Sequence, residues 1–267
     1  MQRAYTTSLF LFPPATVEVQ FDEKWAFVAK KQKNCDPADQ RHGDCWDHTA
    51  IDPEHALLLA IVPGKRTEEK CREIVSEVKS RTGGRTDLLF TSDEHAPYKT
   101  AIKKVYGVET IVLRKPGPGR PPKPQMILPE EVCYATVKKT RKQGRIIKVV
   151  RALVFGTIAL IAAYLVRSTV SSTINTSFVE RHNGTDRGQN ARKTRDTYCF
   201  SKNPDVHDAV TFFVAYSYNF CWPVRTLSGR RHDLTGACTP AMSAGLADHV
   251  WSLKEWLTLP ATHREYE

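Results

Sequence analysis

Hydrophobic periodicity between residues 15 and 113 is the feature that most constrains the fold. From residue 15 to Asp22, apolar side chains alternate with polar ones, as in a strand that buries one face. Further strand-like runs cover 46–51, 56–62, 88–91 and 110–113, and helical patterns cover 67–81 and 97–106. Three consecutive strands followed by alternating helix and strand predict an α/β fold with a mixed sheet flanked by helices.

Acidic side chains fall at two strand ends in this order of elements. Asp22 is expected to end the first strand and Asp93 follows the fourth, so the two carboxylates meet at one edge if these strands are neighbours. Glu180 stands at the start of a later helix, with Asn183 and Arg187 on the same helical face, where these two residues are expected to bind and orient a DNA strand. Clustered carboxylates suit Mg²⁺ or Mn²⁺, and paired metals of this kind catalyse phosphoryl transfer.

Structural explanations compete with this catalytic interpretation. Ser177-x-x-Glu180 also fits a capping box, in which the glutamate binds a free backbone N–H group. Asp22 and Asp93 can equally be strand-terminal aspartates that stabilise turns. Spacing alone leaves both interpretations open.

The positive charge of the chain is concentrated in one segment. The formal net charge is +10, and residues 110–179 carry twelve Lys or Arg against only Glu130 and Glu131. A basic block of this kind is typical of a surface that binds polyanions, nucleic acid first and an acidic membrane second. A solvated basic face is the plainer alternative.

Proline, glycine and basic residues crowd the stretch 114–124, which predicts an exposed linker. Within it, Pro118-Gly119-Arg120-Pro121 is similar to an AT-hook core, and Arg120 would then enter a minor groove. The basic side chains expected to contact phosphates further along are Lys138, Lys139, Arg141 and Lys142.

The most apolar segment, 152–166, has fifteen uncharged residues, whereas about twenty are needed to span a bilayer. Gly156-Thr157 predicts a turn with Thr157 as a helix N-cap. We therefore expect a buried strand at 145–155 and a buried helix at 158–167, not a membrane segment. Seven cysteines without a Cys-x-x-Cys pair indicate free thiols in a reducing cytoplasm.

Several segments, in order, resemble the catalytic region of bacterial transposases of the insertion-sequence-one type over about residues 16–257. They are Phe21-Asp22-Glu23-Lys24-Trp25-Ala26-Phe27-Val28, Thr91-Ser92-Asp93, Phe178-Val179-Glu180-Arg181-His182-Asn183, Asn190-Ala191-Arg192, Cys199-Phe200-Ser201-Lys202, Tyr218-Asn219-Phe220-Cys221-Trp222-Pro223 and Trp251-Ser252-Leu253. The resemblance implies a ribonuclease-H-like core and a catalytic, metal-binding triad of Asp22, Asp93 and Glu180. It also implies a basic residue seven positions after the glutamate, which Arg187 matches.

The resemblance implies metal-dependent DNA cleavage and strand transfer by a homo-oligomer bound to transposon ends and target DNA. Members of that family carry an N-terminal zinc-binding and helix-turn-helix region, which this sequence does not show. Three explanations stay open: a second reading frame, a truncated copy, or a fusion partner whose front is encoded separately. A separately encoded partner that recognises the ends is therefore one of the possible partners. The expected organisation is a tail (1–14), a catalytic domain (15–200) with a basic insertion (114–151), and a helical C-terminal extension (201–267). The expected location is the cytoplasm, at the nucleoid.

Three rival functions remain open at this point. A nuclease on the same core would hydrolyse DNA without joining it, and an inactive remnant would bind DNA only. A membrane-surface protein is the third, against which the short apolar run argues. The DNA ends recognised, the target preference and the oligomeric state do not follow from the sequence.

Overall fold

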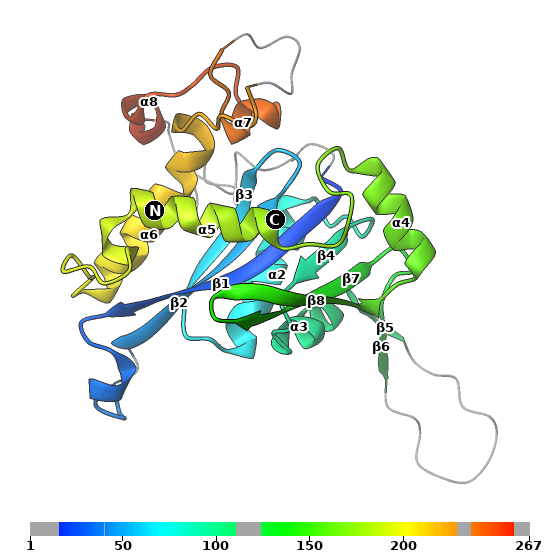
Figure 1. Cartoon of the computed structure of the whole chain (residues 1–267), viewed down its shortest axis with the longest axis horizontal. Coiled ribbons are helices and arrows are strands. Elements are labelled where there is room, and N and C mark those ends of the chain that lie inside the picture. The colour runs from blue at the N-terminus through cyan, green and yellow to red at the C-terminus, as the bar shows by residue number, and fades with distance from the viewer. Residues whose placement is uncertain (1–15, 40, 111–123, 229–235, 259–267) are drawn as a thin grey trace.

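A six-stranded mixed sheet, in the order β3-β2-β1-β4-β7-β8, forms the centre of the protein (Figure 1). The computed structural model describes residues 16–39, 41–110, 124–228 and 236–258. β1 is antiparallel to β2 and parallel to β4, and β7 is parallel to β4 and antiparallel to β8. The strands are β1 (Glu18–Val28), β2 (Gly43–Asp52), β3 (Leu57–Gly64), β4 (Leu89–Ser92), β7 (Cys133–Lys142) and β8 (Arg145–Phe155). This mixed α/β arrangement is compatible with the ribonuclease-H-like fold that the resemblance implies.

Helices flank the sheet. They are α2 (Glu68–Arg81), α3 (Pro97–Tyr106), α4 (Ile158–Arg167), α5 (Ser177–Gln189), α6 (Pro204–Cys221), α7 (Pro240–Ser243) and α8 (Leu253–Thr258). Phe21, Phe90 and Tyr98 are fully buried in the main core, which α2 and α3 cover. A smaller core lies under α4 around Leu89 and Ala135, whose side chains alternate along their strands with those of the main core.

The first strand differs from the expectation. β1 does not end at Asp22 but continues to Val28, because β2 pairs with it throughout from Gln20 to Val28. Its polar face is not exposed to solvent either, since Gln20 and Lys24 are buried beneath α5. The alternation correctly indicated a strand, but polar side chains on the second face contact a helix instead of water.

Helix α5 is aligned on β1 by three alternating side chains of that strand. The Gln20 Oε1 accepts hydrogen bonds from the backbone N–H groups of residues 178 and 179, at 3.1 and 3.2 Å. Asn183 Nδ2 donates to Asp22 at 2.8 Å, and Lys24 pairs with Asp186. Side chains two residues apart on a strand are separated by about 6.6 Å, near the roughly 4.5–6 Å rise of three or four helical residues. The two elements therefore match in register.

A buried cluster of charges joins α5 to the sheet at the far end of this contact. Asp47 on β2 accepts from Lys193 at 2.5 Å and lies 3.3 Å from Lys24 Nζ. All four side chains, including Asp186, are at most 3% exposed. Burial lowers the pKa of Lys24 to about 7. Burial acts to raise the pKa of Asp47, but Lys193 and Lys24 outweigh it and hold that pKa well below its ordinary value.

Most of the strand expected at 110–113 lies outside the described residues. Thr110 belongs to β5 (Val108–Thr110), which pairs with β6 (Gln125–Ile127) in a separate two-stranded ribbon. The place beside β4 belongs to β7, which the pattern missed because its second half is charged. Residues 111–113, the tail 1–14 and most of the linker 114–124 lie outside the described residues. The described part of the basic segment 114–151 is thus largely a hairpin of the main sheet, and the predicted domain division stays a prediction.

The strand and helix expected at 145–155 and 158–167 are confirmed as β8 and α4, with Thr157 as the N-cap. The expected burial is wrong. β8 is an edge strand, exposed along most of its length, and in α4 Ile158 and Val166 are 79% and 86% exposed. Ile161 and Tyr164 of α4 are buried against the sheet, and Leu160 and Leu165 are partly buried beside them. None of the helices in the described ranges is both long and apolar enough to cross a bilayer.

The buried charge cluster predicts a specific stability defect. Lys24→Met leaves Asp186 and Asp47 without one cation, which should lower the free energy of unfolding by about 3–5 kcal/mol. Lys30→Met, at an exposed position a few residues along, should change it by less than about 0.5 kcal/mol. Urea unfolding of both variants at pH 6 measures the difference. Equal stabilities would show that the cluster does not hold α5 in place.

Candidate active site

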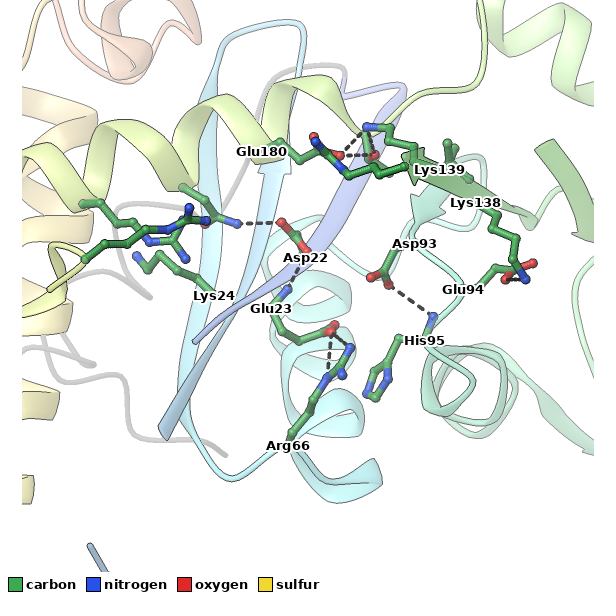
Figure 2. A pocket seen from close by; sticks show the side chains of 16 residues that line it. Asp22, Glu23, Lys24, Arg66, Asp93, Glu94, His95, Lys138, Lys139 and Glu180 are labelled. Carbon is green, nitrogen blue, oxygen red and sulfur yellow. Dashed lines mark hydrogen bonds and ion pairs between the residues drawn. The ribbon is translucent and has the colours of Figure 1, made fainter. Parts of the chain in front are cut away.

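An open cavity of about 630 Å³ lies where β1 extends past the end of β4 (Figure 2). β4 pairs with β1 only at Glu18, Val19 and Gln20, so the edge of β1 beyond Gln20 has no strand neighbour on that side. Strands β1 and β7, the loop after β4 and helix α5 all contribute to its walls. The lining includes Asp22, Glu23, Lys24, Arg66, Asp93, Glu94, His95, Lys138, Lys139, Arg141, Thr176, Glu180, Asn183, Arg187 and Arg195.

Asp22 and Asp93 are brought together as the sequence predicts. Gln20 on β1 is paired with Thr91 on β4. Asp22 and Asp93, each two residues further along, are therefore neighbours. Asp22 accepts from the Glu23 N–H at 2.9 Å and from Asn183, and Asp93 accepts from the His95 N–H at 3.1 Å. Burial, then the nearby carboxylates of Asp93 and Glu23, raise the pKa of Asp22 to about 7. Burial and Glu23 also raise the pKa of Asp93.

Glu180 lines the same cavity, but its carboxylate is directed toward β7 (Figure 2). It forms an ion pair with Lys139 and accepts a hydrogen bond from the Thr176 hydroxyl at 2.8 Å. The capping-box alternative is wrong, because the N-cap of α5 is Thr176 and not Ser177, and its side chain makes no capping hydrogen bond. Glu180 is therefore placed at the cavity by Lys139 and is 39% exposed, with the two aspartates across the space.

The oxygen ligands of this cavity fit a hard divalent cation. Asp22 and Asp93 carry raised pKa values because their charges are buried close together, and a bound cation would relieve that repulsion. Within the described ranges, one group of three potential ligands lies with all atoms within 4.8 Å: Glu23, Cys71 and His95. Burial raises the pKa of the Cys71 thiol to about 12, so this residue stays a neutral thiol and a weak ligand.

Basic side chains surround the carboxylates. Lys138 pairs with Glu94 at 2.6 Å, and Lys139 with Glu180, so both are partly neutralised by the cavity's own acids. Arg141 and Lys142 are exposed at the end of β7. The predicted DNA contact Arg120 lies outside the described residues.

Two arginines on the other side of the cavity have different surroundings. Arg187, at the end of α5, and Arg195 have no hydrogen bond to an acid among the residues that the structure describes. Burial and then the charge of Arg195 lower the pKa of Arg187, while the charges of Asp22 and Asp47 act to raise it. Arginines of one cavity that have no acid hydrogen-bonded to them are suited to bind an anion such as phosphate.

Sequence reasoning missed Glu23, Arg66, His95 and Arg195 among the lining residues. Glu23 is buried on the apolar face of β1, where Arg66 from the loop before α2 donates to it at 2.9 Å. Because Glu23 shares the apolar face of the strand with Val19 and Phe21, the sequence pattern could have indicated a buried acid at this position. Arg66 and Arg195 come from loops with no regular pattern, so only the tertiary structure places them here.

The similarity of this chain to known proteins is weak. No family model matches the chain, and no curated protein matches it. Among solved structures, the chain is similar to the Mos1 transposase paired-end complex with the left transposon end and to the Mos1 strand transfer complex, both at 15% identity with a TM-score of 0.23. A pre-cleavage Mos1 transpososome is similar at 14% identity with the same TM-score. The matches to the paired-end complex and to the strand transfer complex each cover 39% of this chain and 39% of the Mos1 transposase chain.

The raised pKa of Asp22 predicts a pH-dependent stability. Between about pH 4 and 7 the unfolded aspartate is ionised while the folded one keeps its proton, so stability falls as pH rises through this window. Asp22→Asn removes the charge but keeps an oxygen for Asn183. In EDTA its melting temperature should equal that of the natural protein near pH 4 and exceed it at pH 8, by roughly 2–4 °C per kcal/mol.

Thermal unfolding across pH 4–8 measures this difference. Asp36→Asn, at an exposed position, is the matched control and should show no widening gap. Parallel profiles for Asp22→Asn and the natural protein would mean that the buried charge of Asp22 is not destabilising.

Proposed function

We propose that this chain is a DNA transposase that cleaves and joins DNA strands in a metal-dependent reaction. The observation that supports this most directly is the adjacency of Asp22 and Asp93 at the open edge of β1, in a cavity that basic side chains also line. Neighbouring acids beside basic groups suit a reaction on phosphodiesters, in which metals bind the acids and the basic groups bind the strand. Asp22, Asp93 and Glu180 are proposed as the metal ligands.

Mg²⁺ or Mn²⁺, when bound, would polarise the scissile phosphate and lower the pKa of the attacking water. Asp22 and Asp93 would hold the metal, and Asn183 fixes the orientation of Asp22 through its hydrogen bond. Glu180 would join them by exchanging its Lys139 partner for the metal, which leaves Lys139 free for phosphate. Arg187 would orient the strand.

Further parts of the proposal follow from the reaction. Cleavage would free a 3′-hydroxyl, and this hydroxyl would attack target DNA in the same active site. The exposed β7–β8 hairpin, with Lys138, Lys139, Arg141 and Lys142, would hold flanking duplex by phosphate contacts. We propose a homo-oligomer on DNA and action on the nucleoid in the cytoplasm.

The central test is Asp93→Asn. This variant should lose both cleavage and joining while its DNA affinity is retained, because asparagine keeps the shape but not the charge that attracts the metals. Strand-transfer assays in Mg²⁺ or Mn²⁺, with gel shifts on the same preparation, measure both properties. Asp36→Asn should keep full activity.

The products distinguish the rival functions. Nicked DNA without joined product identifies a nuclease, and binding without cleavage by the natural protein identifies an inactive remnant. Full activity in correctly folded Asp93→Asn would remove Asp93 from the mechanism.

The hairpin predicts a change in salt dependence. Replacing Lys138, Lys139, Arg141 and Lys142 by alanine should reduce the slope of log affinity against log salt by roughly one for each phosphate that the hairpin no longer neutralises. The matched control replaces four exposed basic residues of α2 and α3, which cover the face of the sheet opposite to α5. They are Arg72, Lys99, Lys103 and Lys104. Binding isotherms on duplex DNA at several salt concentrations give the slopes. Equal slopes for the two sets would move the DNA-binding surface away from the hairpin.

A further inference from the structure

A second cavity, of about 610 Å³, adjoins the first along β1. Its walls come from the far end of β1 and from the chain that follows α5. They comprise Trp25, Ala26, Phe27, Lys31, Arg187, Arg192, Lys193, Thr194, Arg195, Asp196, Thr197, Tyr198 and Phe200. We call this space the aromatic cavity. Its volume lies within the range of ligand-binding pockets, which is about 300–1,000 Å³.

The aromatic cavity and the carboxylate cavity are neighbours on one strand edge. Asp22 and Lys24 line the first, and Trp25 and Phe27 line the second. Both lie on the side of β1 that β4 leaves open, up to the point where Val28 bridges to Ser201. Arg187 and Arg195 line both cavities, so a strand could pass from one to the other beside them.

Aromatic rings form one wall of this space. The centroids of Trp25 and Phe27 are 5.7 Å apart, and those of Phe27 and Phe200 are 5.0 Å apart. Trp25 is 37% exposed and Tyr198 is 98% exposed. Exposed tryptophan and tyrosine at the mouth of a pocket supply flat faces on which another ring can stack.

The cations of the aromatic cavity are mostly available to a ligand. Arg187, Arg192, Arg195 and Lys31 form no ion pair with an acid in the described part of the chain, and Asp196 is the one acid among the lining residues. Lys193 is different, because Asp47 neutralises it. The cavity therefore combines aromatic faces with an excess of positive charge.

We propose that the aromatic cavity binds unpaired nucleotides of the DNA strand whose phosphodiester enters the carboxylate cavity. The bases would stack on Trp25 and Tyr198, and the phosphates would bind Arg187 and Arg195. This combination of stacking faces and a basic groove is how proteins hold single strands. A paired duplex hides its base faces and would use only the arginines, so the exposed rings favour a strand with bases out of the helix. The proposal rests on the proposed function, because it names the form of that site's substrate.

Binding to single strands, measured in EDTA, tests this without any catalysis. The probe is an oligonucleotide containing 2-aminopurine, with the matching blunt duplex as a second ligand. Tyr198→Ala and Trp25→Ala should each weaken single-strand binding by about 5- to 150-fold, the range for loss of one stacked base, and leave duplex binding unchanged. Trp25→Phe should restore most of the affinity. Quenching of 2-aminopurine on binding should disappear in the alanine variants.

Matched controls separate stacking from folding. Trp222→Ala, at a 52% exposed tryptophan that lines neither cavity, should bind both ligands as the natural protein does. Because Tyr198 is almost fully exposed, its alanine variant should unfold at the natural melting temperature. Arg195→Gln should weaken binding of both the single strand and the duplex, since both contain phosphates.

Two outcomes would overturn the proposal. One is single-strand affinity that survives in folded Tyr198→Ala and Trp25→Ala. The other is displacement of the oligonucleotide by polyglutamate at equal charge concentration, which would show that the cavity binds acidic polymers without reading bases. Failure of the proposed function is a separate result. It would appear as full cleavage and joining activity in Asp93→Asn, while the single-strand binding that depends on Trp25 and Tyr198 is unchanged.

Discussion

Helix α5 is bound to the sheet by charges that have no contact with water, and the candidate site depends on that attachment. Lys24, Asp47, Asp186 and Lys193 come from β1, β2, α5 and the 3₁₀ helix at 191–193. Isolated, each charge would be costly to bury, but together they compensate one another. Because such a cluster needs all its members, it specifies one position for α5 along β1.

That position determines the electrostatics of the cavity. With α5 in place, Asn183 reaches Asp22, and Arg187 stands at the junction of the carboxylate and aromatic cavities. The same packing covers part of Asp22, and this burial, together with the charges of Asp93 and Glu23, raises its pKa. Glu180, one turn earlier at the exposed start of the helix, escapes this burial and pairs with Lys139 instead. The acids thus differ in environment although they line one space.

The sequence predicted the sheet strands 46–51 and 56–62, helices 67–81 and 97–106, and the adjacency of Asp22 and Asp93. The two helices have an apolar stripe and the strand at 56–62 is a short apolar run, so the local pattern is enough to predict these elements. It failed for β7, whose second half is charged because it projects as a hairpin, and for the burial of β8 and α4. An apolar run indicates an element but does not say whether another element covers it.

The amino-acid sequence by itself determined the α/β class and the basic character of residues 110–179. Both follow from periodicity and charge, which are properties of neighbouring residues. That the strands of Asp22 and Asp93 are neighbours was a condition of the prediction, and only the pairing of β1 with β4 decided it. The tertiary structure alone decided that the polar face of β1 is buried and that Glu180 pairs with Lys139. It also decided that Arg66 and Arg195 line the carboxylate cavity. These outcomes depend on contacts between residues far apart in the chain, and no local pattern specifies which distant partner a buried polar group will find.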